Sequence, residues 1–229
     1  MKNFRQVYYN AFSRFYDKFV ALHSADAQGA LRRFFSDKVP VMEGSFVLDI
    51  CTGTGSLLLY LREKVGVDGL VVGADFSMGM LKVGHEKTKI YENICVLASD
   101  VAYLPFDARV FDTVTCTHAF YELKGEIQER VLSEIVRVLK PGKPFLMMEH
   151  DVPRSRLIRA LFYLRLFSMG AKRAIYILRH ERRTLERCFE SVEKITTPTG
   201  RSKIMICCNC KGMTNEKPLP PEQPCDSFP

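Results

Sequence analysis

The sequence has no apolar run that reaches the ~18 residues needed to cross a bilayer as a helix. Its first residues, MKNFRQVYYNAFSRFYDKF, scatter charges among aromatic side chains, so we expect no signal peptide. No internal repeat is present. These absences favour a globular, cytoplasmic protein. With 229 residues, 47% of them hydrophobic, the chain can bury one sizeable core.

The eight cysteines follow no recognised metal-binding or disulfide pattern. Cys207, Cys208 and Cys210 cluster in the sequence CCNC. Structural zinc sites pair one C-x-x-C knuckle with a second pair or with histidines, and no such second pair is present, so we expect no metal. Without an export signal a disulfide framework is not expected either, which favours a reducing compartment.

Positive charge is concentrated in one part of the chain. The net charge is +7, and the ten basic and four acidic residues between Asp151 and Glu190 contribute a net +6 of it. Within this segment, residues 154–187 are predicted to form two basic amphipathic helices. They could recognise an acidic acceptor, make peripheral contact with an anionic membrane, or present a solvated face. Nucleic acid is not an expected partner, because no recognised DNA- or RNA-binding module accompanies the basic residues.

Apolar strand-like segments alternate with helical segments from Ser45 to Cys210. Ser77 is placed to cap the helix that follows the second strand. FESVEKITT and SKIMICCNC are expected to form a closing pair of strands. The sequence therefore predicts an α/β fold with a mostly parallel sheet of seven strands, an antiparallel last strand, and helices on both faces. The five earlier strands are expected in FVLDIC, LVVGAD, NICVLASD, VFDTVTCTH and PFLMMEH.

The stretch VLDICTGTG, residues 47–55, is typical of a buried strand that enters a glycine-rich turn. Gly53 and Gly55 let the backbone approach a ligand closely, and the helix that follows offers free N–H groups to an anion. Such turns hold nucleotides. A dinucleotide site needs G-x-G-x-x-G, but Leu58 occupies the third glycine position. The alternative is a nucleotide site in which the strand ends in an acidic residue, here Asp49.

This second arrangement resembles the first motif of the class I S-adenosylmethionine-dependent methyltransferases, in particular those of type 11 and of quinone biosynthesis. Their strand ends in Asp or Glu and is followed by G-x-G-x-G. Asp49, Gly53 and Gly55 match this motif, and Cys51 replaces the first glycine. Four further stretches match in the family's order: ADFSMGML, ASDVAYLPF, FDTVTCTHAFYEL and RVLKPGKPFLMMEH. The last of them has Lys143 where the family has a second glycine.

The resemblance implies a Rossmann-like sheet that binds S-adenosyl-L-methionine. Asp49 would meet the cationic methionyl end, although the residues alone also allow a turn-capping carboxylate. Asp75 would accept hydrogen bonds from the ribose hydroxyls, and Asp100 would face the adenine amino group. The implied cofactor-binding residues are Asp49, Cys51, Gly53, Gly55, Asp75, Phe76, Met78, Asp100, Val101 and Thr117.

Methyl transfer from a sulfonium is an in-line displacement, so the protein mainly aligns the acceptor and excludes water. A base is needed only when the acceptor must lose a proton. His118 and Tyr121 are the candidate catalytic residues, because they follow the fourth strand at the sheet edge where α/β proteins bind ligands. His118 could instead stack beside the cofactor, and Tyr121 could form a pocket wall. His150, which ends the fifth strand, is a candidate contact of the acceptor.

The same resemblance predicts how the chain is organised. Residues 1–40, with Tyr16 in a Tyr-Asp pair, would form a helical lid over the cofactor, although the aromatic helix could also be an amphipathic helix packed on the sheet. Residues 41–213 would form the methyltransferase domain, with 151–190 as a helical insertion on the substrate side. The proline-rich tail 214–229 is expected to be disordered. The expected function is methyl transfer to a small-molecule or lipid-like acceptor. The alternative is a methyltransferase-like binding or regulatory subunit without catalysis.

Overall fold

The computed structural model describes residues 13, 29–123, 126–151 and 172–211. The predicted lid helix with Tyr16, the first basic helix of the insertion and the tail lie outside these residues. The strands are β1 Phe46–Ile50, β2 Leu70–Asp75, β3 Ile94–Ala98, β4 Thr113–Thr117, β5 Phe145–His150, β6 Phe189–Thr196 and β7 Ser202–Cys210. The helices are α2 Ala30–Lys38, α3 Ser56–Val65, α4 Met78–Thr88, the 3-10 helix η1 Phe120–Glu122, α5 Glu126–Val138 and α7 Lys172–Cys188.

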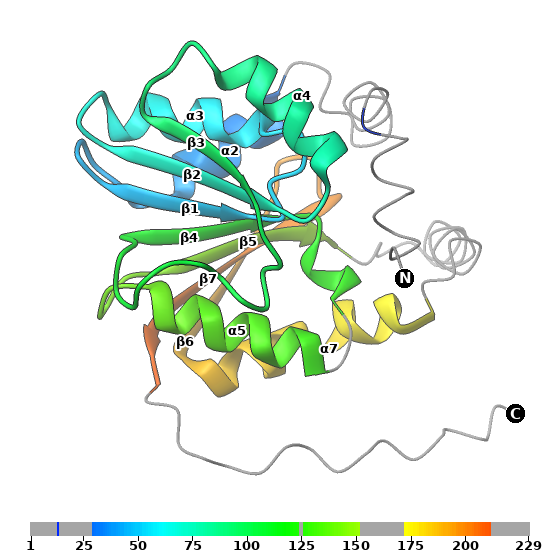
Figure 1. Cartoon of the computed structure of the whole chain (residues 1–229). Coiled ribbons are helices and arrows are strands. Elements are labelled where there is room, and N and C mark those ends of the chain that lie inside the picture. Colours follow the sequence, from blue (N-terminus) through cyan, green and yellow to red (C-terminus); the bar gives the residue numbers. More distant parts are fainter. Residues whose placement is uncertain (1–12, 14–28, 124–125, 152–171, 212–229) are drawn as a thin grey trace, which may run out of the picture.

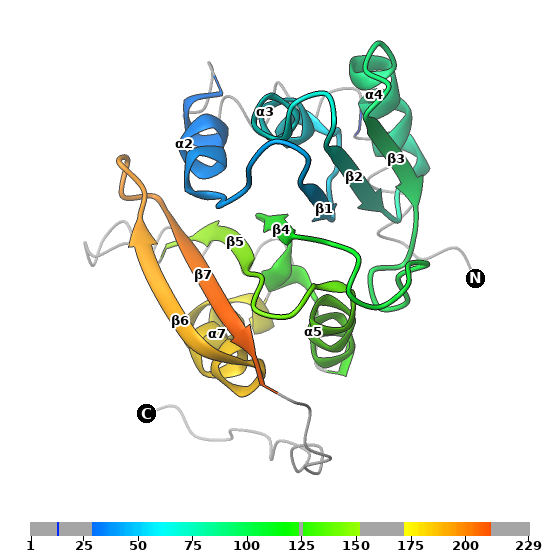
Figure 2. The same ribbon diagram turned by 90° about the vertical axis from the view of Figure 1, so that its left-hand side faces the viewer.

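The strands form one sheet in the order β3-β2-β1-β4-β5-β7-β6. The pairs from β3 to β5 are parallel, whereas β7 lies antiparallel to both β5 and β6. The hairpin of β6 and β7 forms one edge of the sheet, and β3 forms the other (Figure 2). This arrangement confirms the predicted mostly parallel sheet with an antiparallel last strand.

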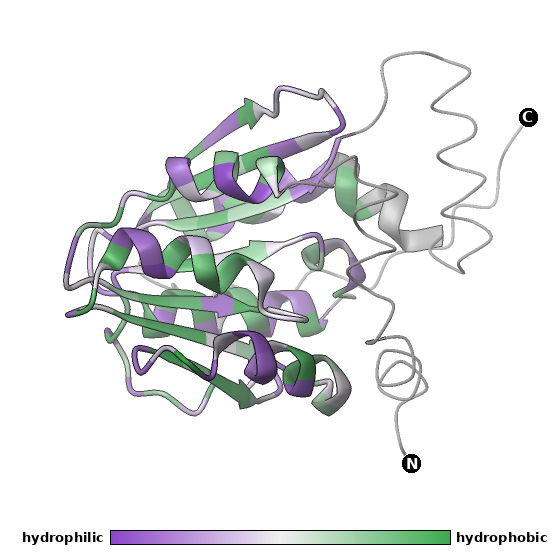
Figure 3. Ribbon diagram, turned by 90° about the horizontal axis from the view of Figure 1, so that it is seen from above, coloured by the Kyte–Doolittle hydropathy of each residue, from purple (hydrophilic) through white to green (hydrophobic). Residues whose placement is uncertain are grey.

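Helices cover both faces of the sheet, as predicted. α2, α3 and α4 lie on one face, and α5 and α7 lie on the other (Figure 1). Side chains of β1 contribute to the hydrophobic cores on both faces of the sheet. Val47 packs in the core under α2 and α3, whereas Leu48 and Ile50 belong to the core on the opposite face. Strands buried on both faces need a continuous apolar sequence, which explains the apolar strand segments. The strands in the middle of the molecule are mainly hydrophobic in Figure 3, and polar residues gather on the outer helices.

The order of the strands places the ligand site. The chain proceeds outward from β1 to β2 and β3, and then returns to the other side of β1 with β4 and β5. Open α/β sheets bind ligands at this reversal, in the crevice at the carboxyl ends of the strands. The turn after β1 and the loop after β4 therefore lie side by side at one edge of the sheet. Within the described residues, no helix is both long and apolar enough to cross a membrane.

Ser77 caps α4, as predicted. Its hydroxyl accepts a hydrogen bond from the backbone N–H of Met80 at 3.3 Å. The cap satisfies one of the N–H groups that the first turn of a helix leaves without a partner. It also fixes where α4 begins, directly after the end of β2.

Replacing Ser77 by alanine should lower the free energy of unfolding by about 1 kcal/mol, because the Met80 N–H loses its acceptor. Urea denaturation followed by circular dichroism measures the change. Ser133→Ala is the matched control, because Ser133 lies inside α5 and its hydroxyl donates to the Glu129 carbonyl. An equal loss in both variants would contradict the capping role.

Candidate active site

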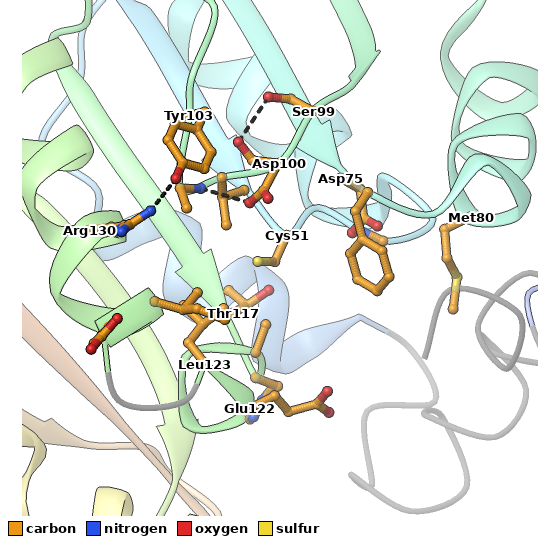
Figure 4. A pocket seen from close by; sticks show the side chains of 18 residues that line it. Cys51, Asp75, Met80, Ser99, Asp100, Tyr103, Thr117, Glu122, Leu123 and Arg130 are labelled. Atoms are coloured by element: carbon orange, nitrogen blue, oxygen red, sulfur yellow. Dashed lines mark hydrogen bonds between the residues drawn. The ribbon is translucent and has the colours of Figure 1, made fainter. Parts of the chain in front are cut away.

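A cavity of about 560 Å³ opens at the carboxyl ends of the parallel strands. Cys51 lies in the middle of the view in Figure 4, with Asp100 above it and Asp75 to its upper right. The loop after β4 and the first turn of α5 complete the wall. Of the predicted cofactor-binding residues, those that line the cavity are Cys51, Gly53, Asp75, Phe76, Asp100, Val101 and Thr117.

The Asp75 carboxylate is held rigidly at the end of β2. Its Oδ2 accepts the N–H of Gly53 at 2.9 Å, and its Oδ1 accepts the N–H of Ser77 at 2.8 Å. Burial raises the pKa of this carboxyl group, and the backbone N–H groups oppose the rise. A carboxylate has about four acceptor positions, so Asp75 can still receive hydroxyl groups from a ligand. It can therefore hold the glycine turn and a sugar at the same time.

The glycine turn has the backbone conformation that its motif requires. Gly53 and Gly55 have φ values of 58° and 68°, in the left-handed region that glycine adopts without strain. Cys51, which replaces the first glycine of the motif, also has a left-handed φ of 54°. This conformation costs a residue with a side chain about 1–2 kcal/mol. The thiol of Cys51 forms a hydrogen bond with the thiol of Cys116 on β4. The cysteine therefore preserves the turn, at some cost in strain.

Asp49 lies beneath the turn and does not line the cavity. Its two oxygens accept hydrogen bonds from the hydroxyls of Thr52 and Thr115, each at 2.7 Å. Burial raises the pKa of Asp49 to about 7, against the effect of both hydroxyls. The carboxyl group thus ties the turn to β4. Its predicted contact with the methionyl end of the cofactor stays a prediction.

Polar and apolar residues together line the part of the cavity near β3. Asp100 accepts the N–H of Ala102 at 3.0 Å through Oδ1, and Val101 beside it is buried. Phe76, after β2, is 36% exposed and contributes an aromatic ring to the wall. These groups suit a flat heterocycle with a polar edge. Met78 does not line the cavity, because the first turn of α4 directs Met80 inward instead and leaves Met78 48% exposed.

His118 stands at the other end of the cavity, next to two further predicted residues. The His118 and His150 rings lie 4.6 Å apart, and the Tyr121 ring lies 5.8 Å from His150. His118 lines the cavity, whereas Tyr121 and His150 stand behind it. His118 also has a left-handed φ of 52°, and such strain is concentrated at functional sites.

The His118 imidazole is held in its neutral form. Burial lowers its pKa well below the ordinary value, and the nearby His150 and Arg32 lower it further. Both ring nitrogens are buried and have no hydrogen-bond partner within the described part of the chain. A neutral imidazole without a partner can accept a proton from a ligand in the cavity.

The sequence did not identify every residue of the wall. The first turn of α5 contributes Ile127 and Arg130, and Arg130 donates a hydrogen bond to the hydroxyl of Tyr103. Ile127 is an apolar residue in a polar segment, and this was the one sequence feature that could have indicated that α5 contributes to the wall. The other lining residues that sequence reasoning missed are Met80, Ser99, Ala102, Tyr103, Ala119, Leu123 and Glu126.

Within the described ranges, no group of three or more His, Cys, Asp or Glu side chains is arranged to hold a metal ion. The cysteines of CCNC occupy successive positions of β7, where side chains alternate between the two faces of the sheet. Cys207 is buried in the core, whereas Cys208 and Cys210 are partly exposed.

A model of the ubiE/COQ5 methyltransferase family matches residues 2–171, more than half of the chain. The chain belongs to the ubiE/COQ5 methyltransferase family. The predicted resemblance to class I methyltransferases is thereby confirmed. The match extends beyond the motifs at 44–150 that carried the resemblance, toward both ends of the chain.

Curated relatives in this family are demethylmenaquinone methyltransferases. One from Staphylococcus epidermidis is 35% identical over 152 residues, which are 66% of this chain and 62% of the relative. One from Staphylococcus carnosus is 38% identical over 138 residues, which are 60% of this chain and 56% of the relative. The chain thus spans about three fifths of the length of these relatives.

Solved structures share the fold at lower identity. A SAM-dependent methyltransferase from Aquifex aeolicus superposes with a TM-score of 0.59 and 21% identity, covering 81% of this chain and 95% of that one. The PH0226 protein of Pyrococcus horikoshii gives 0.59 and 20%, covering 86% and 99%. These likenesses confirm the Rossmann-like fold class.

The His118 imidazole should become protonated at a lower pH than an ordinary histidine, because its surroundings favour the uncharged form. Nuclear magnetic resonance of the ring carbons and nitrogens measures the titration, with His118→Asn used to assign the signal. A His118 signal with a midpoint at or above the ordinary histidine pKa of about 6.5 would contradict the lowered pKa.

Proposed function

We propose that this protein transfers a methyl group from S-adenosyl-L-methionine to a quinone-like, lipid-soluble acceptor. The observation that carries the proposal is the convergence of Asp75, Asp100 and His118 on one cavity at the reversal of strand order. Two carboxylates at one end suit a nucleoside. A neutral imidazole at the other end suits an acceptor that must lose a proton.

The groups that line the cavity suit the cofactor. Asp75 has acceptor positions left for the ribose hydroxyls, and Asp100 would accept from the adenine amino group. Val101 and Phe76 offer apolar surface to the two faces of a ring. Gly53 and Gly55 keep side chains away from the methionyl part, and the first turn of α3 offers N–H groups to its carboxylate.

When bound, the cofactor supplies an activated methyl group on a positively charged sulfur. The chain then has to align the acceptor atom, exclude water and remove a proton. Ala119 and Leu123 line the wall next to His118 and limit access by water. His118 accepts the acceptor's proton at one of its ring nitrogens, and the neighbouring ring of His150 limits its rotation. Alignment of this kind can contribute roughly 7–11 kcal/mol to lowering the barrier.

The acceptor class is supported by the relatives and by the wall. Demethylmenaquinone, named for the Staphylococcus relatives, is an apolar ring compound, and Leu123 and Ile127 add apolar surface to the cavity. Because the chain spans only part of the relatives' length, the acceptor has to be identified by direct assay.

Peripheral contact with an anionic membrane through residues 154–187 would give such an acceptor a short path to the cavity. In the described part of this segment, Arg182, Arg183 and Arg187 are exposed on α7. Arg182 and Arg187 form ion pairs with Glu186 and Glu129, which reduces the net charge available. Flotation with phosphatidylglycerol vesicles tests the contact, and recovery of the protein only in the vesicle-free fraction would refute it.

Calorimetry should show that the protein binds S-adenosylhomocysteine and that Asp75→Ala weakens this binding at least about tenfold. One lost hydrogen bond between a charged group and a ligand is worth about 1.5–3 kcal/mol. Asp68→Ala is the matched control, because Asp68 lies in the exposed turn before β2. Binding of a nicotinamide dinucleotide instead would support an oxidoreductase and refute the proposal.

A methyl-transfer assay with demethylmenaquinol should show turnover, and His118→Ala should lower kcat by about 10²–10⁴ if the imidazole is the base. The affinity for S-adenosylhomocysteine should change by less than about threefold, a change of under 1 kcal/mol. His85→Ala, an exposed substitution on α4, is the control. Cofactor binding with no turnover on any quinol would favour the non-catalytic binding or regulatory subunit.

A further inference from the structure

A fully buried glutamate supports the loop that forms the acceptor end of the cavity. Glu149, near the end of β5, has no exposed surface. Its Oε1 accepts the backbone N–H of Phe120 at 2.8 Å, and the carboxyl group also accepts the N–H of Tyr121. These are the first two residues of η1. Glu149 therefore supplies acceptors for N–H groups that so short a helix cannot satisfy internally.

The helix held in this way borders the proposed acceptor site. Glu122 at the end of η1 lines the cavity, as do Ala119 before it and Leu123 after it. Tyr121 contacts the His150 ring, which in turn contacts the His118 ring. A shift of η1 would move the wall and the aromatic cluster together.

Two further buried charged groups accompany Glu149. Lys203 is the direct partner of Glu149 in the antiparallel register of β5 and β7. Its ammonium group forms an ion pair with Glu181 of α7 and donates to the Leu178 carbonyl at 3.1 Å. The Glu181 and Lys203 side chains are only 4% and 5% exposed. The cluster thus joins α7, β7, β5 and η1.

The hydrogen bonds of the cluster leave one oxygen of each acid unused. Oε2 of Glu149 and Oε2 of Glu181 are buried and lack a hydrogen-bond partner among the described residues. With one ammonium group for two carboxyl groups, two ionised acids would leave a negative charge without compensation. A proton on Glu149 removes that charge, and Lys203 remains paired with ionised Glu181. Buried charges that lack a partner are costly, so the protonated arrangement is favoured.

The electrostatics agree with this assignment. Burial and then the neighbouring Glu181 raise the pKa of Glu149 to about 8, against the effects of the η1 N–H groups and Lys203. Burial raises the pKa of Glu181 to about 7, and Lys203 opposes the rise. The buried thiol of Cys116, on β4, is a further titratable group that interacts with Glu149. Because a raised acid pKa favours the proton in the folded state, its stabilising effect is lost as pH rises from about 4.5 to about 8.

We propose that Glu149 is a positioning residue that acts as a neutral acid and holds η1 at the acceptor end of the cavity. The assignment of that end to the acceptor rests on the proposed function. Because Oε1 remains an acceptor when the proton is on the other oxygen, the neutral acid keeps both η1 N–H groups satisfied. A neutral amide in its place should do the same, whereas alanine should not.

Hydrogen exchange of residues 118–123, corrected for the intrinsic rate, tests the proposal in the wild type, Glu149→Gln and Glu149→Ala. Wild-type protection should fall at least about tenfold between about pH 6 and about pH 9, because opening of η1 lets water reach the ionised Glu149 and so relieves the cost of its buried charge. Glu149→Gln should keep its protection at both pH values, and Glu149→Ala should lose it at both. Glu193→Gln, on the exposed side of β6, should behave as the wild type.

Loss of protection in Glu149→Gln, or wild-type protection that does not change with pH, would overturn the proposal. If Glu149→Ala does not fold, these two comparisons still decide it. In the methyl-transfer assay, the wild type should lose kcat at alkaline pH, and Glu149→Gln should lack this loss. Failure of every variant to bind S-adenosylhomocysteine would refute the proposed function, while the exchange result would still test how η1 is held.

Discussion

The Asp75 carboxylate, which accepts the N–H groups of Gly53 and Ser77, is the interaction on which the site depends. It joins the turn after β1 to the start of the helix after β2, so that two loops from neighbouring strands keep one geometry. Residues of both loops line the cavity. The same carboxylate keeps acceptor positions for a ligand, so the group that builds the site is also placed to bind in it.

Buried acids recur along the carboxyl edge of the sheet. Asp49, Asp75 and Glu149 are each the last or the next-to-last residue of a parallel strand, and burial raises the pKa of all three. Each has a structural task, since each accepts hydrogen bonds from a loop at that edge. Parallel strands bring their carboxyl ends together, so loops that must be held also meet there. Acidic side chains are suited to this task because one carboxyl group accepts from several N–H or O–H donors.

Strain is concentrated in the same place. Cys51 and His118 both adopt left-handed backbone conformations, and both line the cavity. Such conformations persist only where the surroundings fix them. The thiol contact between Cys51 and Cys116 and the ring contact between His118 and His150 are the contacts that do so here. The turn at Cys51 shows that a cysteine can stand where the family motif has glycine without loss of the loop geometry.

Much of the fold and of the candidate site could be predicted from the sequence. Apolar strands, the glycine turn and the Ser77 cap each depend on neighbours within a few positions, so the sequence alone determined all seven strands and the edge that carries the site. The family resemblance carried by its motifs also indicated Asp75 and Asp100, and His118 was indicated because it follows the fourth strand.

Other features depend on side-chain direction and on partners distant in sequence. Only the tertiary structure decided that Met80 rather than Met78 faces the cavity, that Thr52 and Thr115 occupy both oxygens of Asp49, and that Ile127 and Arg130 join the wall. Likewise, Glu149, Glu181 and Lys203 come from β5, α7 and β7, and only the packing of α7 against the sheet makes them one buried cluster. Burial and charge pairing are properties of that packing, which is why no local pattern could reveal them.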